Sequence, residues 1–113
     1  MILENINDIV NSIKDSILLH VPAKYIYFFG SHVYGTPHKD SDIDIYLVVP
    51  DEIESLLFLY SDIIGDLFEK DILSVDLQLI RISKFNFRKD KSRFVGNIIN
   101  KGRLIYESKN QIL

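Results

Sequence analysis

The sequence predicts an α/β (α+β) protein in which a small mixed β-sheet of three to four strands is flanked by helices. Apolar residues recur with helical spacing over residues 2–19 and 51–70. Short apolar runs of strand length lie between and after these segments, at residues 25–29, 42–49 and 73–80. Such an alternation of helical and strand patterns is typical of a sheet with helices packed against it.

The N-terminal half contains the first expected helix and the first two strands. One helical face carries isoleucines at spacings of three and four residues, namely Ile2, Ile6, Ile9, Ile13 and Ile17. Pro22 ends this helix, and the first apolar run then forms a strand. A Gly-Ser turn at Gly30 opens a short helix that Gly35 ends. Thr36–Pro37 turns the chain into the second strand, which Pro50 stops.

The segment after the second strand predicts a second long helix. Asp51 is a suitable N-cap, and the helix extends to about Lys70. Helical winding gathers one apolar face from Ile53, Leu56, Leu57, Tyr60, Ile64 and Leu67, with Phe58 nearly opposite. This helix is more apolar than one buried face requires. Its outer apolar side chains are therefore either singly exposed or part of a surface for a protein partner.

A basic segment follows the third strand. Residues 81–93 carry six cations interleaved with Phe85 and Phe87. In one interpretation this is a solvated loop and helix that the two Phe side chains anchor to the core. In the other, one or two cations reach the phosphates of a ligand. A short helix through Asn100 and a last strand at 104–106 complete the expected elements.

The stretch from Gly30 to Asp44 is the most informative part of the chain. Gly30 lacks a Cβ, so backbone can approach a phosphate, and Ser31 can donate its hydroxyl at the start of the short helix. His32, in the same turn, can donate as well. Ten residues separate Ser31 from Asp42, and Asp42 and Asp44 point to one face of a strand, where they can hold Mg²⁺. A phosphate cradle beside metal-binding carboxylates suits nucleotidyl transfer; the alternative is a strand–turn–strand with an acidic edge.

A third carboxylate lies inside the third apolar run. Asp76 alternates with Ser74 and Gln78, which gives this strand one polar face. That face either only meets water or also holds a metal. A charged side chain in an apolar run is costly to bury without a partner, so Asp76 is a candidate third acid.

The joint pattern of Gly30–Ser31, ten residues, and then Asp42 and Asp44 resembles the signature of the polymerase β-type nucleotidyltransferase superfamily. The size of the chain resembles the minimal nucleotidyltransferase branch, and the resemblance covers most of the sequence. It implies the nucleotidyltransferase fold, with a third carboxylate on a following strand, for which Asp76 is the match. One departure is that family members often carry Arg directly after Gly-Ser, whereas this chain has His32.

The resemblance also implies an activity and a set of site residues. It implies transfer of a nucleotide monophosphate, most simply AMP from ATP, with one or two Mg²⁺ ions. Asp76 would be either a metal ligand or the base that activates the acceptor hydroxyl. The implied catalytic and metal-binding residues are Asp42, Asp44 and Asp76, and the implied nucleotide-binding residues are Gly30, Ser31 and His32.

Two hypotheses about the partner follow from the resemblance. Minimal members are often paired with a small all-helical protein of the HEPN type, as antitoxins that modify or bind it. The first hypothesis is an enzyme that transfers AMP to a hydroxyl of such a partner. The second is a non-catalytic nucleotide-binding or partner-binding module that neutralises a helical partner by forming a complex. Only about twenty residues follow the start of the last expected helix, so we expect the acceptor on another chain.

Composition sets the remaining expectations. The chain has 113 residues, of which 47% are hydrophobic, and we expect a single domain over residues 1–113. A net charge of −3 lacks the basic excess of a nucleic-acid-binding protein, so no direct nucleic-acid binding is expected. With no cysteine there is neither a disulfide nor a thiolate metal site. No secretory or membrane-spanning pattern is present, which predicts a cytoplasmic protein, and a homodimer is compatible with the sequence.

Overall fold

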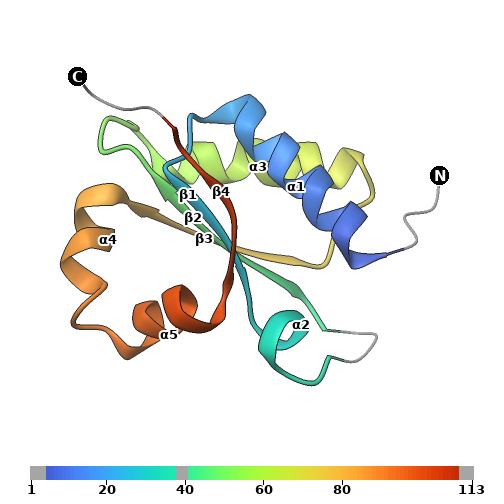
Figure 1. Cartoon of the computed structure of the whole chain (residues 1–113). Coiled ribbons are helices and arrows are strands. Elements are labelled where there is room, and N and C mark those ends of the chain that lie inside the picture. The colour runs from blue at the N-terminus through green and yellow to red at the C-terminus, as the bar shows by residue number, and fades with distance from the viewer. Residues whose placement is uncertain (1–4, 38–40, 110–113) are drawn as a thin grey trace.

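The sheet has four strands in the order β3-β2-β1-β4. The computed structural model describes residues 5–37 and 41–109 (Figure 1). β1 (Tyr25–Phe29) lies antiparallel to both β2 (Ile43–Val49) and β4 (Arg103–Glu107), and β2 lies parallel to β3 (Val75–Arg81). The mixed α+β architecture and the strand count agree with the expectation from the sequence.

Helices cover both faces of this sheet (Figure 1). α1 (Ile6–His20) and α3 (Leu56–Glu69) pack on one face. α4 (Ile82–Arg88) and α5 (Arg93–Lys101) pack on the other, and α2 (Ser31–Tyr34) is a single turn after β1. In the described parts of the chain, no helix is both long and apolar enough to cross a membrane.

Alternation along the strands divides the apolar side chains between two cores. Ile26 and Phe28 of β1 point toward α1 and α3, whereas Tyr27 and Phe29 point toward α4 and α5. Phe28 is fully buried, and burial of such a side chain contributes about 1.5–3 kcal/mol to folding. The same alternation places Asp44 on the α4/α5 face, because it lies two residues before the buried Tyr46.

The start of α3 differs from the expectation. Ser55, rather than Asp51, is the N-cap, and its hydroxyl accepts a hydrogen bond from the Phe58 N–H at 3.1 Å. A turn in which the Ile53 N–H donates to the Pro50 carbonyl precedes the helix and delays its start. Asp51 instead accepts from the backbone N–H (3.0 Å) and the hydroxyl of Ser83, in the first turn of α4. The expected cap therefore serves another helix.

The buried face of α3 also differs from the expected one. Its buried side chains are Leu59, Ile63 and Leu67, of which only Leu67 belongs to the predicted face. Leu57 and Phe58 are 69% and 71% exposed. The predicted face and the buried face of this helix are both apolar, so periodicity alone could not decide which of the two packs on the sheet and α1.

The basic segment contains a helix, as one interpretation of the sequence expected, but the bounds of this helix were not predicted. α4 is short, and its apolar pattern is broken by polar side chains, so no helical periodicity is visible. Phe85 is buried and anchors α4 to the sheet, whereas Phe87 is 64% exposed. The expectation that both Phe side chains anchor this segment is therefore correct for Phe85 and wrong for Phe87.

Candidate active site

Two carboxylates meet across the parallel pair of strands at the centre of the candidate site. Asp44 of β2 is directly opposite Asp76 of β3 in the strand register. Residues in register on neighbouring parallel strands point to the same face. The two carboxyl groups are therefore close enough for Asp76 to raise the pKa of Asp44.

The electrostatics of Asp44 indicate a site that favours a cation. Burial raises the pKa of the Asp44 carboxyl, and the charges of Asp76 and Asp42 raise it further. His32 acts in the opposite direction. Asp42 is exposed and lies two residues before Asp44, just ahead of the strand. A divalent cation beside Asp44 would relieve this repulsion between negative charges.

The donor set fits Mg²⁺ bound together with a substrate. Within residues 5–37 and 41–109, no group of three His, Cys, Asp or Glu side chains stands arranged as a complete metal centre. The pair that the fold brings together is Asp44 and Asp76, with Asp42 adding its negative charge. Mg²⁺ commonly takes one or two carboxylates and completes its shell with water and substrate phosphates. Such an incomplete set of protein ligands therefore suits Mg²⁺ better than a cation that needs an all-protein cage.

Gly30 is required by its proximity to Asp44. It adopts φ +86°, and an added Cβ would lie 1.9 Å from the Asp44 Oδ2 atom. The position cannot accept a side chain unless the carboxylate moves. The sequence explained this glycine by the approach of a phosphate, but the tertiary structure adds a second reason. The turn and the Asp44 carboxylate are in direct contact.

The first turn of α2 presents backbone N–H groups beside the carboxylates. The N–H groups of Val33 and Tyr34 donate to the Gly30 carbonyl at 2.9 and 3.0 Å. Those of Ser31 and His32 have no such intramolecular acceptor within the described residues. The predicted nucleotide-binding residues Gly30, Ser31 and His32 thus lie next to Asp44.

His32 also has a structural role. Its Nε2 atom lies 3.2 Å from the carbonyl oxygen of Ser41, just before β2. The imidazole stacks near the Phe28 ring, with the two ring centroids 6.4 Å apart. His32 therefore holds α2 against the segment that carries Asp42.

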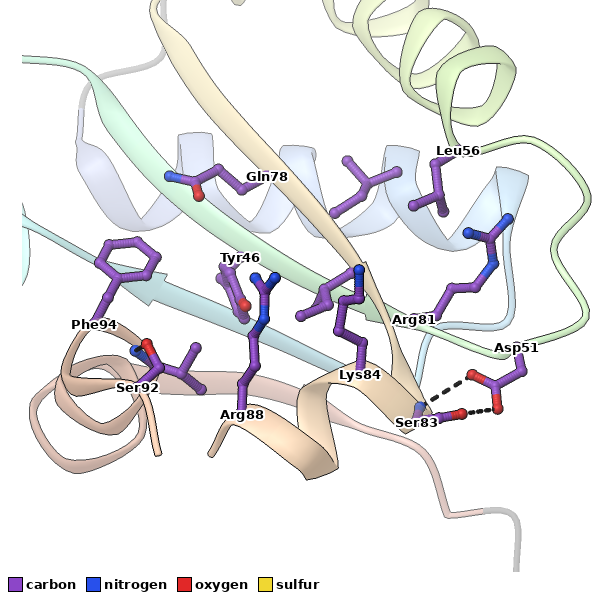
Figure 2. Close-up of a pocket in the computed structure, with 13 residues that line it drawn as sticks. Tyr46, Asp51, Leu56, Gln78, Arg81, Ser83, Lys84, Arg88, Ser92 and Phe94 are labelled. Carbon is purple, nitrogen blue, oxygen red and sulfur yellow. Dashed lines mark hydrogen bonds between the residues drawn. The ribbon is translucent and has the colours of Figure 1, made fainter. Parts of the chain in front are cut away.

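A cavity of about 560 Å³ lies between α4, α5 and strands β2 and β3 (Figure 2). Tyr46 and Gln78 contribute to its floor, and each follows one of the two paired aspartates by two residues on the same strand face. Phe94 of α5 and the cations Lys84 and Arg88 of α4 line the other side. The spacing of two residues from each aspartate was the signal available in the sequence for Tyr46 and Gln78.

The basic side chains at this cavity have different roles. Arg81 donates to the carbonyl oxygen of Ile53 at 2.8 Å, so it holds the segment between β2 and α3. Lys84 and Arg88 instead extend from α4 toward the strands (Figure 2), and within the described chain neither forms an ion pair. Burial raises the pKa of the Tyr46 phenol, and the neighbouring positive charge of Arg88 lowers it.

A four-stranded mixed sheet that pairs two carboxylates beside a Gly-Ser turn defines the nucleotidyltransferase class of site and fold. The chain belongs to the polymerase beta nucleotidyltransferase family, whose sequence pattern matches residues 11–111. Members of this family typically use a divalent metal ion.

Known proteins resemble this chain in sequence and in fold. The protein adenylyltransferase MntA of Shewanella oneidensis is 31% identical over 75 residues, which cover 66% of this chain and 52% of MntA. The match thus spans about half the length of that relative. A chain of a toxin–antitoxin crystal structure with AMP-PNP is 22% identical with a TM-score of 0.60, over 88% of this chain and 73% of that one.

A second solved structure has the same fold. It contains a tri-AMPylated HEPN toxin of Shewanella oneidensis in complex with its MNT antitoxin. The matched chain is 18% identical with a TM-score of 0.56, over 89% of this chain and 71% of that one. At these identities the two structural matches establish the fold.

Proposed function

We propose that this protein is a metal-dependent nucleotidyltransferase that transfers AMP from ATP to a hydroxyl of a partner protein. The observation that carries the proposal is the pairing of Asp44 with Asp76 beside the Gly30 turn. Family membership supports nucleotidyl transfer, and the similarity to MntA, a protein adenylyltransferase, supports AMP and a protein acceptor.

The chain's own residues suggest a division of roles. Ser31 and His32 would bind the phosphates through backbone N–H groups and the Ser31 hydroxyl. Asp42, Asp44 and Asp76 would hold Mg²⁺, which stabilises charge on the phosphates and favours ionisation of the attacking hydroxyl. The acceptor oxygen attacks the α-phosphorus, the bond from the α-phosphorus to the bridging oxygen breaks, and pyrophosphate leaves. The hydroxyl proton passes to Asp76 where this carboxylate acts as the general base, the alternative to its role as third metal ligand.

The partner that we propose is a small helical protein of the HEPN type, with this chain as its antitoxin. The fold is shared with chains of toxin–antitoxin structures, one of which contains an AMPylated HEPN toxin. The exposed apolar side chains of α3 supply a contact surface on this chain. They include Leu57, Phe58 and Phe68, which are 69%, 71% and 65% exposed.

The same surface favours a second candidate function. A module without catalytic activity could neutralise a helical partner through α3 alone, and the active-site carboxylates would then be dispensable. The two functions differ in one respect that an experiment can measure. Only the enzyme needs Asp42 and Asp44 for the partner to be inactivated.

Intact-mass spectrometry of the partner separates the two functions. We expect the wild-type chain, with ATP and Mg²⁺, to add one or more AMP units to a HEPN-type partner. Asp42→Asn and Asp44→Asn should reduce this transfer by about a hundredfold or more, because each loses a metal ligand that acts in the transition state. Asp15→Asn, at an exposed position of α1, is the matched control and should retain transfer. Neutralisation of the partner by the double Asn variant, with no mass change, would favour the binding module.

A further inference from the structure

We infer that the cavity between α4, α5 and strands β2 and β3 binds the nucleoside half of the nucleotide. In this inference the base stacks on Phe94, and Gln78 contacts the edge of the base. The inference rests on the proposed function, because it takes the phosphates to lie beside Asp44. It goes further, since it names the residues that select the base and separates them from those that bind phosphate.

The position of the cavity along the strands is the first argument. Tyr46 and Gln78 are in register with each other and lie two residues beyond Asp44 and Asp76. Two residues of a strand span about 7 Å, which is the distance from an α-phosphate to the far side of a ribose. Gly30 approaches Asp44 from the neighbouring strand, at the other end of this face. A nucleotide with its phosphates at Gly30 therefore extends its sugar and base over Tyr46 and Gln78.

The aromatic wall is the second argument. Phe94 packs nearly perpendicular to Phe29 and Tyr46, at ring-centroid distances of 5.9 and 6.1 Å. These contacts hold the Phe94 ring in place, yet 48% of the residue is exposed. Nucleobases stack on aromatic rings that are fixed in position and partly exposed, as the Phe94 ring is beside Tyr46 and Gln78. The cavity of about 560 Å³ is within the size range of small-ligand sites.

The polar groups supply the third argument. Lys84 and Arg88 are one helical turn apart and extend into the cavity from α4 (Figure 2). The Asp51 carboxylate at the cavity accepts hydrogen bonds from Ser83, and Lys84 and Arg88 are donors that suit the acceptor atoms of a ribose and a base. The Gln78 amide has both a donor and an acceptor, which can pair with the edge of a base.

Calorimetry with two ligands isolates the nucleoside contribution. ATP and inorganic tripolyphosphate are each titrated into the full chain in the presence of Mg²⁺. Only ATP carries a nucleoside that can fill the cavity, so the difference between the two affinities reports the nucleoside contribution. We expect Phe94→Ala to weaken ATP binding by about tenfold and to leave tripolyphosphate binding unchanged, as expected for loss of one stacked base. Gln78→Ala should change the ratio of ATP to GTP affinity. Phe87→Ala, an exposed Phe of α4 outside the cavity, is the matched control and should bind both ligands as the wild type does.

The remaining outcomes distinguish this inference from the proposed function. If Phe94→Ala binds ATP as the wild type does while Ser31→Ala weakens both ligands, the nucleoside assignment is wrong and the proposed function stands. If Phe94→Ala keeps ATP affinity but loses transfer to the partner, the cavity holds the acceptor and the assignment is again wrong. If the wild type binds neither ligand, both the proposed function and this inference fail. Thermal melting of each variant checks folding, and Phe94→Leu replaces the Ala variant if that one unfolds.

Discussion

Replacement of Gly30 by Ala tests the contact between the Gly-Ser turn and the carboxylate site. With φ +86° and ψ −160°, Gly30 occupies a backbone region that is essentially restricted to glycine, and another residue there costs about 1–3 kcal/mol. The new Cβ would also lie 1.9 Å from the Asp44 Oδ2 atom. Displacement of a packed group adds about 1–3 kcal/mol. The expected loss in the free energy of unfolding is therefore about 2–6 kcal/mol, or roughly 8–24 °C in Tm.

Gly65→Ala is the matched control for this variant. Gly65 lies in α3, and an added Cβ there meets no atom within 4 Å. Both substitutions restrict the unfolded chain equally, so that effect cancels in the comparison. Gly65→Ala should raise the free energy of unfolding by about 0.5–1 kcal/mol, because Ala is the better helix former. Urea unfolding measures both variants, and a Gly30→Ala protein as stable as Gly65→Ala would refute the described geometry.

Two further substitutions test the electrostatics and the helix boundary. The pKa of Asp44 is raised above its usual value of 3.8 in the folded state. Between the unfolded and the folded pKa, the folded protein therefore holds a proton that the unfolded chain has released, and stability falls as the pH rises through this interval. Asp44→Asn should therefore raise the Tm of the metal-free protein at pH 7, flatten the pH dependence above about pH 4, and abolish stabilisation by Mg²⁺; a lower Tm would contradict this. Ser55→Ala should cost about 1 kcal/mol in urea unfolding, because it removes the N-cap of α3, whereas the exposed Glu54→Ala should be nearly neutral. Equal stability of these two variants would mean that α3 begins elsewhere.

Local patterns in the sequence were sufficient to predict the elements that carry the candidate site. The apolar run before Gly30 and the run that begins near Asp42 appear as β1 and β2, with boundaries within one residue of those expected. The period of two along a strand placed Asp42 and Asp44 on one face, and the same period singled out Asp76. The functional roles of these residues remain predictions that the experiments above test.

The tertiary structure decided which of these groups meet. Asp44 and Asp76 are more than thirty residues apart, and they face each other only because β2 and β3 pair in one particular register. A shift of that register by one residue would turn Asp76 to the other face of the sheet. The contact of Gly30 with Asp44 likewise depends on the antiparallel pairing of β1 with β2.

The cavity and the helix orientations also depend on tertiary contacts. α4 has too little apolar periodicity for its bounds to be visible in the sequence. It folds over Tyr46 because Phe85 is buried there and Asp51 caps its first turn. α3 has two apolar faces, and the face that contains Ile63 is the one that packs on the sheet and α1. Sequence periodicity determines which side chains share a face of one element. Which face is buried, and which residues of distant elements meet, is determined by the free energy of packing the elements together.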